Sequence, residues 1–316
     1  MASLFGASFS AVLVLFLFIV AGFIARRTNI LPENAAMVLS KLENYIVIPA
    51  VAFKVFTKYC TVESFTEHSE LVVHAAIVLV VATVIAIALS CLFAKKGSYT
   101  RNIYQYALTY GNFGFMGIAL VPAVMNEEAL YWYMVYLLPI YLVSYSYGLY
   151  SLQPAEKREG NMLKCLLNPI IISILFSMIV GLSGLGKHLP AFLNTAIADC
   201  SACQGPLAMI LTGFIIGGYR IPEILKNGKV YLATLLRLIV LPLLFILGLR
   251  FFGAGEVSLR MTLFAFATPL GLNTVVFPAA YGGETKTGAS MALVSHTLCL
   301  VTIPLMYTFL ESVILK

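Results

Sequence analysis

Two short stretches of the sequence place glycine, proline and asparagine inside otherwise apolar segments. They read Tyr110-Gly111-Asn112-Phe113-Gly114-Phe115-Met116-Gly117 and Thr268-Pro269-Leu270-Gly271-Leu272-Asn273-Thr274. Glycine costs a helix interior about 1 kcal/mol relative to alanine, and proline removes a backbone donor. A helix interrupted in this way offers free N–H groups at a helix N-terminus, which attract carboxylates. The amides of Asn112 and Asn273 add further donors and acceptors, so both stretches predict an anion-binding site.

Two acids, Glu43 and Asp199, also fall inside apolar segments. Because burying a charge in a membrane is expensive, such acids are candidates for a functional role. Either carboxylate could carry a proton or gate a central site, provided that its surroundings raise its pKa towards neutrality. The alternative is a structural pair with Lys41, Arg237 or a backbone donor.

Three further groups have more than one interpretation. Arg237 could hold a substrate carboxylate, reach the membrane surface or pair with an acid, and we favour a structural role. His296, beside Ser295, could relay protons, although a lone histidine in a helix bundle is more often a hydrogen-bonded packing residue. Cys200 and Cys203 form a C-x-x-C without a second pair or a nearby histidine, so we expect packing and no metal site.

The composition decides what kind of protein must position these groups. Hydrophobic residues make up 60% of the 316 positions and charged residues 11%, against about 45–50% and about 25% in soluble domains. A membrane helix needs about 20 apolar residues, so the length suits about ten spans without a separate catalytic domain. The net charge of +6 is explained by basic residues at span ends, and no nucleic-acid partner is implied.

Charges, glycines and prolines divide the apolar sequence into ten predicted spans. Their bounds are 6–25, 34–57, 69–93, 101–123, 128–150, 165–185, 191–218, 229–252, 258–280 and 287–314. We interpret the first as a span rather than a signal peptide, because residues 1–8 contain no lysine or arginine. The sequence thus predicts an all-α polytopic membrane protein.

Lysine and arginine counts predict the orientation, because cytoplasmic loops are enriched in both. The odd-numbered connections hold 12 of them: Arg26, Arg27, Lys95, Lys96, Arg101, Lys157, Arg158, Lys164, Arg220, Lys226, Lys229 and Lys286. The even-numbered connections and the tails hold 6: Lys54, Lys58, Lys187, Arg250, Arg260 and Lys316. We therefore expect the odd-numbered connections in the cytoplasm and both termini outside a cell membrane.

The polar stretch 151–164 divides the chain into five-span halves, 1–150 and 165–316. Five is odd, so the second half would be inverted relative to the first. A shift of 156 residues superposes Pro122-Ala123 on Pro278-Ala279, Glu128 on Glu284 and Glu43 on Asp199. Interruptions at corresponding positions of two inverted halves mark a binding site, whereas Gly213 and Gly217 are typical of close helix packing.

These motifs resemble bacterial members of the auxin efflux carrier family. The resemblance rests on Gly-Asn-Phe-Gly-Phe-Met-Gly from Gly111, on Asn168-Pro169, on Pro269-x-x-x-Asn273 and on Tyr281-Gly282-Gly283-Glu284, and it covers nearly the whole chain. It implies ten helices in two inverted repeats, with spans 4 and 9 broken and crossing, and a fold related to PIN-FORMED carriers and bile-acid sodium symporters. It also implies a scaffold of spans 1, 2, 6 and 7 beside a moving transport unit.

The resulting hypothesis is a secondary transporter of a small organic acid anion such as malate or malonate, coupled to protons or sodium. The substrate-binding residues would be Asn112, Gly111, Gly114, Pro269, Gly271 and Asn273, with Glu43 and Asp199 in coupling or gating. The alternatives are an intramembrane enzyme, for which no nucleophile and base motif is evident, and a sodium symporter of a larger amphipathic anion. Neither a cofactor nor a catalytic residue is expected; homodimer formation, transport direction and coupling ion stay open.

Overall fold

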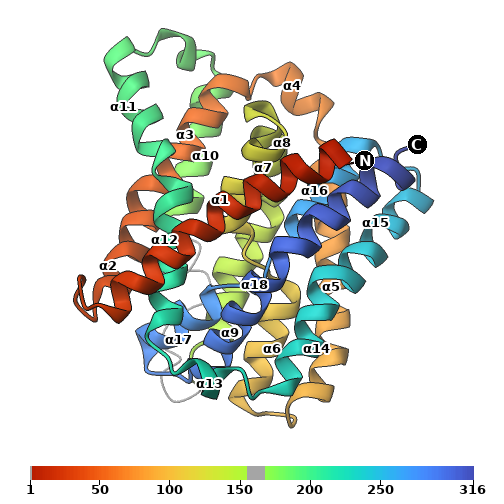
Figure 1. Cartoon of the computed structure of the whole chain (residues 1–316). Coiled ribbons are helices and arrows are strands. Elements are labelled where there is room, and N and C mark those ends of the chain that lie inside the picture. Colours follow the sequence, from red (N-terminus) through yellow and green to blue (C-terminus); the bar gives the residue numbers. More distant parts are fainter. Residues whose placement is uncertain (1, 155–167) are drawn as a thin grey trace.

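The computed structural model describes residues 2–154 and 168–316, so most of the predicted connection 151–164 lies outside the described residues. The described chain is built from helices joined by short turns (Figure 1). Six of these helices are long and apolar enough to cross a membrane: Ser3–Arg27, Ala35–Tyr59, Glu70–Phe93, Ala191–Gly217, Gly228–Phe251 and Lys286–Ile314. Their number and apolar character indicate a multi-pass membrane protein.

The first half of the chain ends in a helix that runs nearly to the central connection. Its elements are α1 (Ala2–Arg27), α2 (Ala35–Leu42), η1 (Glu43–Val47), α3 (Ile48–Tyr59), α4 (Val62–Glu67), α5 (Glu70–Phe93), α6 (Tyr99–Thr109), η2 (Phe113–Gly117), α7 (Ile118–Val124), α8 (Glu127–Val143), η3 (Ser144–Gly148) and α9 (Leu149–Ser151). The segments η1, η2 and η3 are π-helical turns within longer helices.

The second half follows a similar course. Its elements are α10 (Pro169–Leu182), η6 (Leu185–His188), α11 (Ala191–Ala202), α12 (Gln204–Gly217), α13 (Ile221–Ile224), α14 (Gly228–Leu235), η7 (Leu236–Val240), α15 (Leu241–Phe251), α16 (Glu256–Phe266), α17 (Asn273–Tyr281), α18 (Lys286–Phe309) and η8 (Leu310–Ile314). In both halves the helical segments begin and end within about one turn of the predicted bounds.

Two π-helical turns hold the charged residues that the sequence places in mid-helix. Glu43 opens η1, six residues before Pro49 in the first turn of α3, and Arg237 lies in η7, five residues before Pro242. A proline cannot donate to the carbonyl one turn earlier, and a widened π turn accommodates the loss. The prolines thereby set the local geometry around both charges.

Helix α1 packs along α12 and α18, and glycines allow the close approach (Figure 1). A Cβ atom on Gly213 would overlap the carbonyl oxygen of Ile19, and one on Gly22 would overlap that of Ile210. At Gly217 a Cβ would lie 2.8 Å from the Cβ of Arg26. The packing role predicted for Gly213 and Gly217 is thus confirmed.

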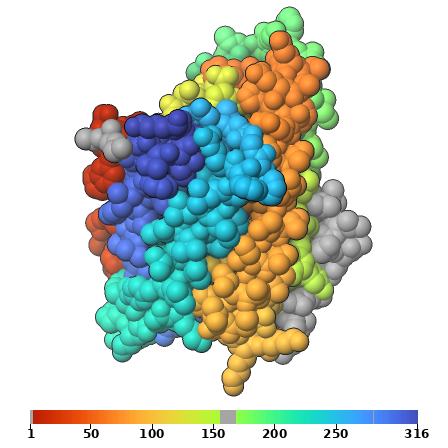
Figure 2. Space-filling model, turned by 90° about the vertical axis from the view of Figure 1, so that its right-hand side faces the viewer, coloured from red at the N-terminus to blue at the C-terminus, as the bar shows by residue number. Residues whose placement is uncertain are grey.

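The two halves of the chain interleave. Helices α15 and α16 of the second half pack against α5 of the first, and Figure 2 shows these segments side by side in cyan and orange. The start of α1 and the end of η8 lie at the same end of the molecule in both views (Figures 1 and 2). In contrast, α11 projects from the bundle, and none of its residues is buried.

Candidate functional site: two interrupted helices that cross

The interruptions predicted from glycine, proline and asparagine lie against each other. One chain segment leaves helix after Thr109 and re-enters it at Phe113, and the other leaves after Phe266 and re-enters at Asn273. The extended backbones between them form an antiparallel bridge at Gly111 and Leu270. Across this bridge the Asn112 N–H donates to the Pro269 carbonyl over 2.7 Å. Each interruption thus satisfies part of the backbone that the other leaves free.

Two of the glycines are required by this close approach. A Cβ atom on Gly111 would lie 2.7 Å from the Thr268 hydroxyl oxygen and would overlap the Arg237 guanidinium. A Cβ on Gly271 would lie 2.9 Å from the Tyr110 carbonyl oxygen. Gly114 differs, because its nearest neighbour would be the Tyr141 hydroxyl at 3.8 Å, an ordinary contact. The half-buried Gly114 therefore leaves room on its face of η2.

Arg237 binds the C-terminal ends of both interrupted helices. Its Nη1 donates to the carbonyls of Leu108 and Thr109 over 3.0 and 3.2 Å, and its Nη2 donates to the Ala265 carbonyl over 2.8 Å. The side chain is fully buried, and its guanidinium carbon lies 4.9 Å from the centre of the Phe266 ring. The last carbonyls of a helix lack intrahelical partners and form its negative end. One arginine thus caps two helices, which supports the structural role that we favoured.

The asparagines mark the opposite, N-terminal ends. Asn112 directly precedes η2, and Asn273 is the first residue of α17. The Asn112 Nδ2 lies 2.9 Å from His296 Nε2, and the Asn273 Nδ2 donates to the Tyr106 hydroxyl over 3.0 Å. That hydroxyl is in turn 3.0 Å from Ser144 Oγ. Both amide nitrogens therefore already have partners, and the buried Asn112 Oδ1 has none among the described residues.

Further side chains from distant parts of the chain complete the crossing. The Ser295 hydroxyl accepts from the Leu270 N–H over 3.1 Å. The Tyr133 hydroxyl donates to the Phe113 carbonyl, and the Gln204 amide of α12 donates to the Phe115 carbonyl over 2.8 Å. These bonds tie the π turn η2 to α8 and α12. Sequence reasoning missed Tyr106, Tyr133, Ser144 and Gln204, because no spacing links them to the interruptions.

Glu43 and Asp199, which the sequence pairs by a shift of 156 residues, lie in different surroundings. Glu43 is fully buried, and neither carboxylate oxygen has a hydrogen-bond partner among the described residues. Its turn η1 packs against α10, α11 and α12. Asp199 is exposed on the projecting helix α11. Within the described ranges no hydrogen bond joins either acid to Lys41, to Arg237 or to the crossing.

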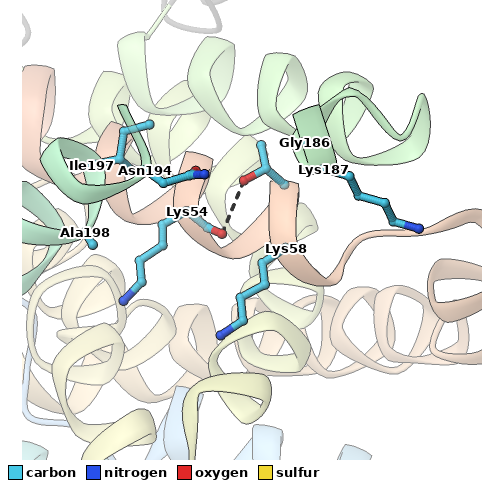
Figure 3. A pocket seen from close by; sticks show the side chains of 8 residues that line it. Lys54, Lys58, Gly186, Lys187, Asn194, Ile197 and Ala198 are labelled. Atoms are coloured by element: carbon cyan, nitrogen blue, oxygen red, sulfur yellow. Dashed lines mark hydrogen bonds between the residues drawn. The ribbon is translucent and has the colours of Figure 1, made fainter. Parts of the chain in front are cut away.

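Two cavities adjoin the end of α3 where Lys54 lies, and their volumes are about 380 and 390 Å³. The first is lined by Lys54, Thr57, Lys58, Gly186, Lys187, Asn194, Ile197 and Ala198 (Figure 3). The second lies between α1, α3, α7 and α12 and includes Ala119 and Gln204. In Figure 3 the ammonium groups of Lys54 and Lys58 point to the same side, where they contact Glu127 of α8 at 2.5 and 2.6 Å.

Comparisons with known proteins identify the family of the chain. A family model described as "Membrane transport protein" matches residues 7–160 and 156–307. The chain therefore belongs to the membrane transport protein family, the auxin efflux carrier family that its motifs resemble. It is also 22% identical over 300 residues to a protein of Methanocaldococcus jannaschii described as an uncharacterized transporter, covering 93% of this chain and 96% of that protein.

Proposed function

We propose that this membrane transporter carries a small organic acid anion, such as malate or malonate, by alternating access. One observation carries the proposal: two helix interruptions pair so that two helix N-termini and two asparagines meet at one crossing. Free N–H groups and the positive ends of helix dipoles favour a carboxylate. Arg237 occupies the opposite helix ends, so the N-terminal ends stay available for a ligand.

We propose further that ten spans form two inverted repeats, 1–150 and 165–316. The antiparallel pairing of Gly111 with Leu270 supports this arrangement, since inverted halves bring equivalent interruptions together in opposite directions. In this scheme α1, α2–α3, α10 and α11–α12 form the scaffold, and the remaining helices move as a transport unit. A homodimer is an additional proposal, for which the exposed face of α11 offers a surface.

Glu43 is the first candidate for coupling, because a fully buried carboxylate without a partner is costly as an anion. A proton or a sodium ion would remove that cost. Asp199 stays a proposal on its sequence position alone. We predict that Glu43→Gln reduces gradient-driven accumulation more than it reduces ligand binding. A Glu43→Gln protein that accumulates substrate against a gradient like the wild type would make Glu43 structural.

The decisive experiment measures transport in proteoliposomes of the purified protein with a panel of labelled acids. The panel includes malate, malonate, an aromatic monocarboxylate and a larger amphipathic anion, each with and without pH and sodium gradients. We expect accumulation of a small acid that depends on one of the two gradients. If every small acid stays at the level of empty liposomes while the amphipathic anion is accumulated, the proposed substrate class is wrong.

A further inference from the structure

The histidine beside Asn112 decides which end of that amide is left without a hydrogen-bond partner. His296 Nδ1 lies 2.7 Å from the Ala292 carbonyl oxygen, which can only accept. Nδ1 must therefore carry a proton, and in a neutral ring Nε2 is then an acceptor. Since Nε2 lies 2.9 Å from the Asn112 amide nitrogen, the amide must donate to it. Neutral His296 thus turns the Asn112 oxygen Oδ1 away from the ring.

That orientation is unfavourable for an anion. The buried Oδ1 has no partner among the described residues, and it presents a partial negative charge. A carboxylate at the N-terminus of η2 would need a donor from Asn112 instead. A second proton on the ring, at Nε2, changes the hydrogen bond, because Nε2–H can only donate. The amide would then turn by half a rotation, accept through Oδ1 and direct Nδ2 towards the ligand.

We propose that His296 is a positioning residue whose protonation at Nε2 turns Asn112 from an acceptor into a donor, so that a carboxylate and a proton bind together. This inference rests on the proposed function and identifies the coupling ion as a proton for this site. The proton comes from water on the side to which the site is open. It leaves Nε2 when the carboxylate is released on the other side. Nδ1 keeps its bond to Ala292 throughout, so the ring need not move.

The charges around α18 leave His296 without a competing acid. The elements packed against α18 include α1, α6, α12, α13, α14, α16, α17, η7 and η8. Most of their charged groups lie at the helix ends, in pairs such as Lys286 with Glu223 and Arg260 with Glu311. At the level of the crossing the neighbouring titratable groups are Arg237, Tyr106, Tyr110 and, on α18 itself, Cys299. Arg237 and Tyr106 are engaged in the bonds described above, and the Cys299 thiol donates to the His296 carbonyl over 3.1 Å. The buried Tyr110 hydroxyl has no partner among the described residues. Arg237 opposes a second positive charge in the empty site, and a bound carboxylate offsets that repulsion.

The first test needs no substrate. Histidine and asparagine side chains are labelled with ¹⁵N in the purified full-length protein and followed by NMR between pH 5 and 9. The chain contains four histidines, so His296→Gln assigns the ring signal and Asn112→Ala the amide signal. We expect the neutral ring to carry its proton on Nδ1, and the Asn112 amide to change at the same pH as the ring. A neutral ring protonated on Nε2, or an amide that ignores ring protonation, overturns the proposal.

The second test measures binding of labelled malonate and malate across the same pH range. Linkage predicts that the apparent Kd rises about tenfold per pH unit above the pH at which the empty site titrates. His296→Gln should bind the acids with an affinity that no longer depends on pH, because a glutamine amide can donate or accept but does not titrate. The matched control is His74→Gln, since His74 bonds Ser258 Oγ on α16 at 2.8 Å, outside the crossing.

The outcomes separate the two hypotheses. Acid binding by His296→Gln and by His74→Gln could both keep the pH dependence of the wild type. In that case the site binds acids, but His296 does not control the orientation of Asn112. If no variant binds either acid while the ring and amide titrate together, the switch exists and the proposed substrate class is wrong. A ring that stays neutral down to pH 5 with malonate bound overturns proton coupling at His296.

Discussion

At the scale of single residues, the crossing is defined by which atoms still lack partners. Arg237 uses three hydrogen bonds on the carbonyl ends of α6 and α16, so its charge neutralises helix dipoles. Each asparagine amide already has a hydrogen-bond partner for its nitrogen. The proposed ligand contacts, Asn112 and Asn273, are therefore held by hydrogen bonds to His296 and Tyr106. These bonds fix the orientation of each amide, which the proposed protonation of His296 would change at Asn112.

Replacing the asparagines tests that arrangement directly. A hydrogen bond to a charged group contributes about 1.5–3 kcal/mol, so Asn112→Ala or Asn273→Ala should weaken acid binding by about 10- to 150-fold. Aspartate at either position should weaken it more, because it adds a negative charge opposite an anion. Equilibrium binding of the labelled acid checks both. Asn102→Ala is the control, since its amide bonds the Ser151 carbonyl at one end of α6; wild-type affinity in both crossing variants would remove the crossing as the site.

At the scale of elements, the sequence predicts the positions where helices are interrupted. It predicts less well which side chains bond to the interrupted backbone. The interruptions can be predicted from Gly111, Pro269 and Gly271 alone. Glycine widens the range of backbone dihedral angles at its position, and proline removes a backbone N–H donor. The partners of those interruptions are distant in sequence: Arg237 caps Leu108 across 129 residues, and Asn112 meets His296 across 184. No helical or strand periodicity connects such residues, so only the folded chain identifies them. His296 was a weak candidate in the sequence for the same reason.

Glycine substitutions should separate the two kinds of helix contact. Gly111→Leu should abolish transport and disturb the fold around Arg237, because no Cβ fits there. Gly114→Ala should fold normally, whereas Gly114→Leu should block transport by filling the space on η2. Gly213→Leu and Gly217→Leu should mainly lower thermal stability or expression, since they separate α12 from α1. Thermal unfolding and transport are measured on the same preparations; a Gly114→Leu protein with wild-type transport would contradict an open face at η2.

An ion-pair bridge between the proposed scaffold and the proposed transport unit offers a second test at this scale. Glu127 at the start of α8 accepts from Lys54 and Lys58 of α3, and these two lysines lower the pKa of its carboxyl to about 2. The usual glutamate pKa is about 4.3, so the contribution of this bridge is present above that pH and is lost only as the pH falls through about 2. Between pH 5 and 8 the Glu127 bridge is constant. A pH dependence of transport in this range must therefore arise elsewhere.

Breaking the Glu127 bridge should loosen one end of the molecule. Exposed ion pairs contribute about 0.5–1 kcal/mol, so Glu127→Gln should raise the labelling rate of a cysteine placed at Ala119 by about two- to fivefold. Ala119 lines the cavity next to the bridge. The pH profile of transport between pH 5 and 8 should keep its shape. Glu128→Gln is the control, because Glu128 is exposed on the same turn; equal labelling in the two variants would show that the bridge does not restrain this end.

At the scale of the whole molecule, the orientation in the membrane decides on which side the Glu127 bridge lies. An even number of spans returns the chain to its starting side, and the first and last helices do begin and end at the same end of the bundle (Figure 1). The excess of lysine and arginine in the odd-numbered connections, 12 against 6, predicts that the other end lies in the cytoplasm. In that orientation the Glu127 bridge and both cavities beside Lys54 lie on the outer side. Ion pairs lie at the other end as well, where Arg220 and Lys286 contact Glu223 and Arg26 contacts Glu33.

Cysteine accessibility decides the orientation. Single cysteines at Lys157 and at Lys316 are introduced into a variant in which Cys91, Cys165, Cys200 and Cys203 are replaced by serine; Cys60 and Cys299 are buried and are kept. We expect a membrane-impermeant maleimide to label the Lys316 position in intact cells and the Lys157 position only after permeabilisation. Labelling of both positions from the same side would require an even number of crossings between them, and the inverted ten-span arrangement, which has five there, would then fail. Labelling of Lys157 alone from outside would keep the repeat but reverse it, which would move the Glu127 bridge to the cytoplasmic entrance.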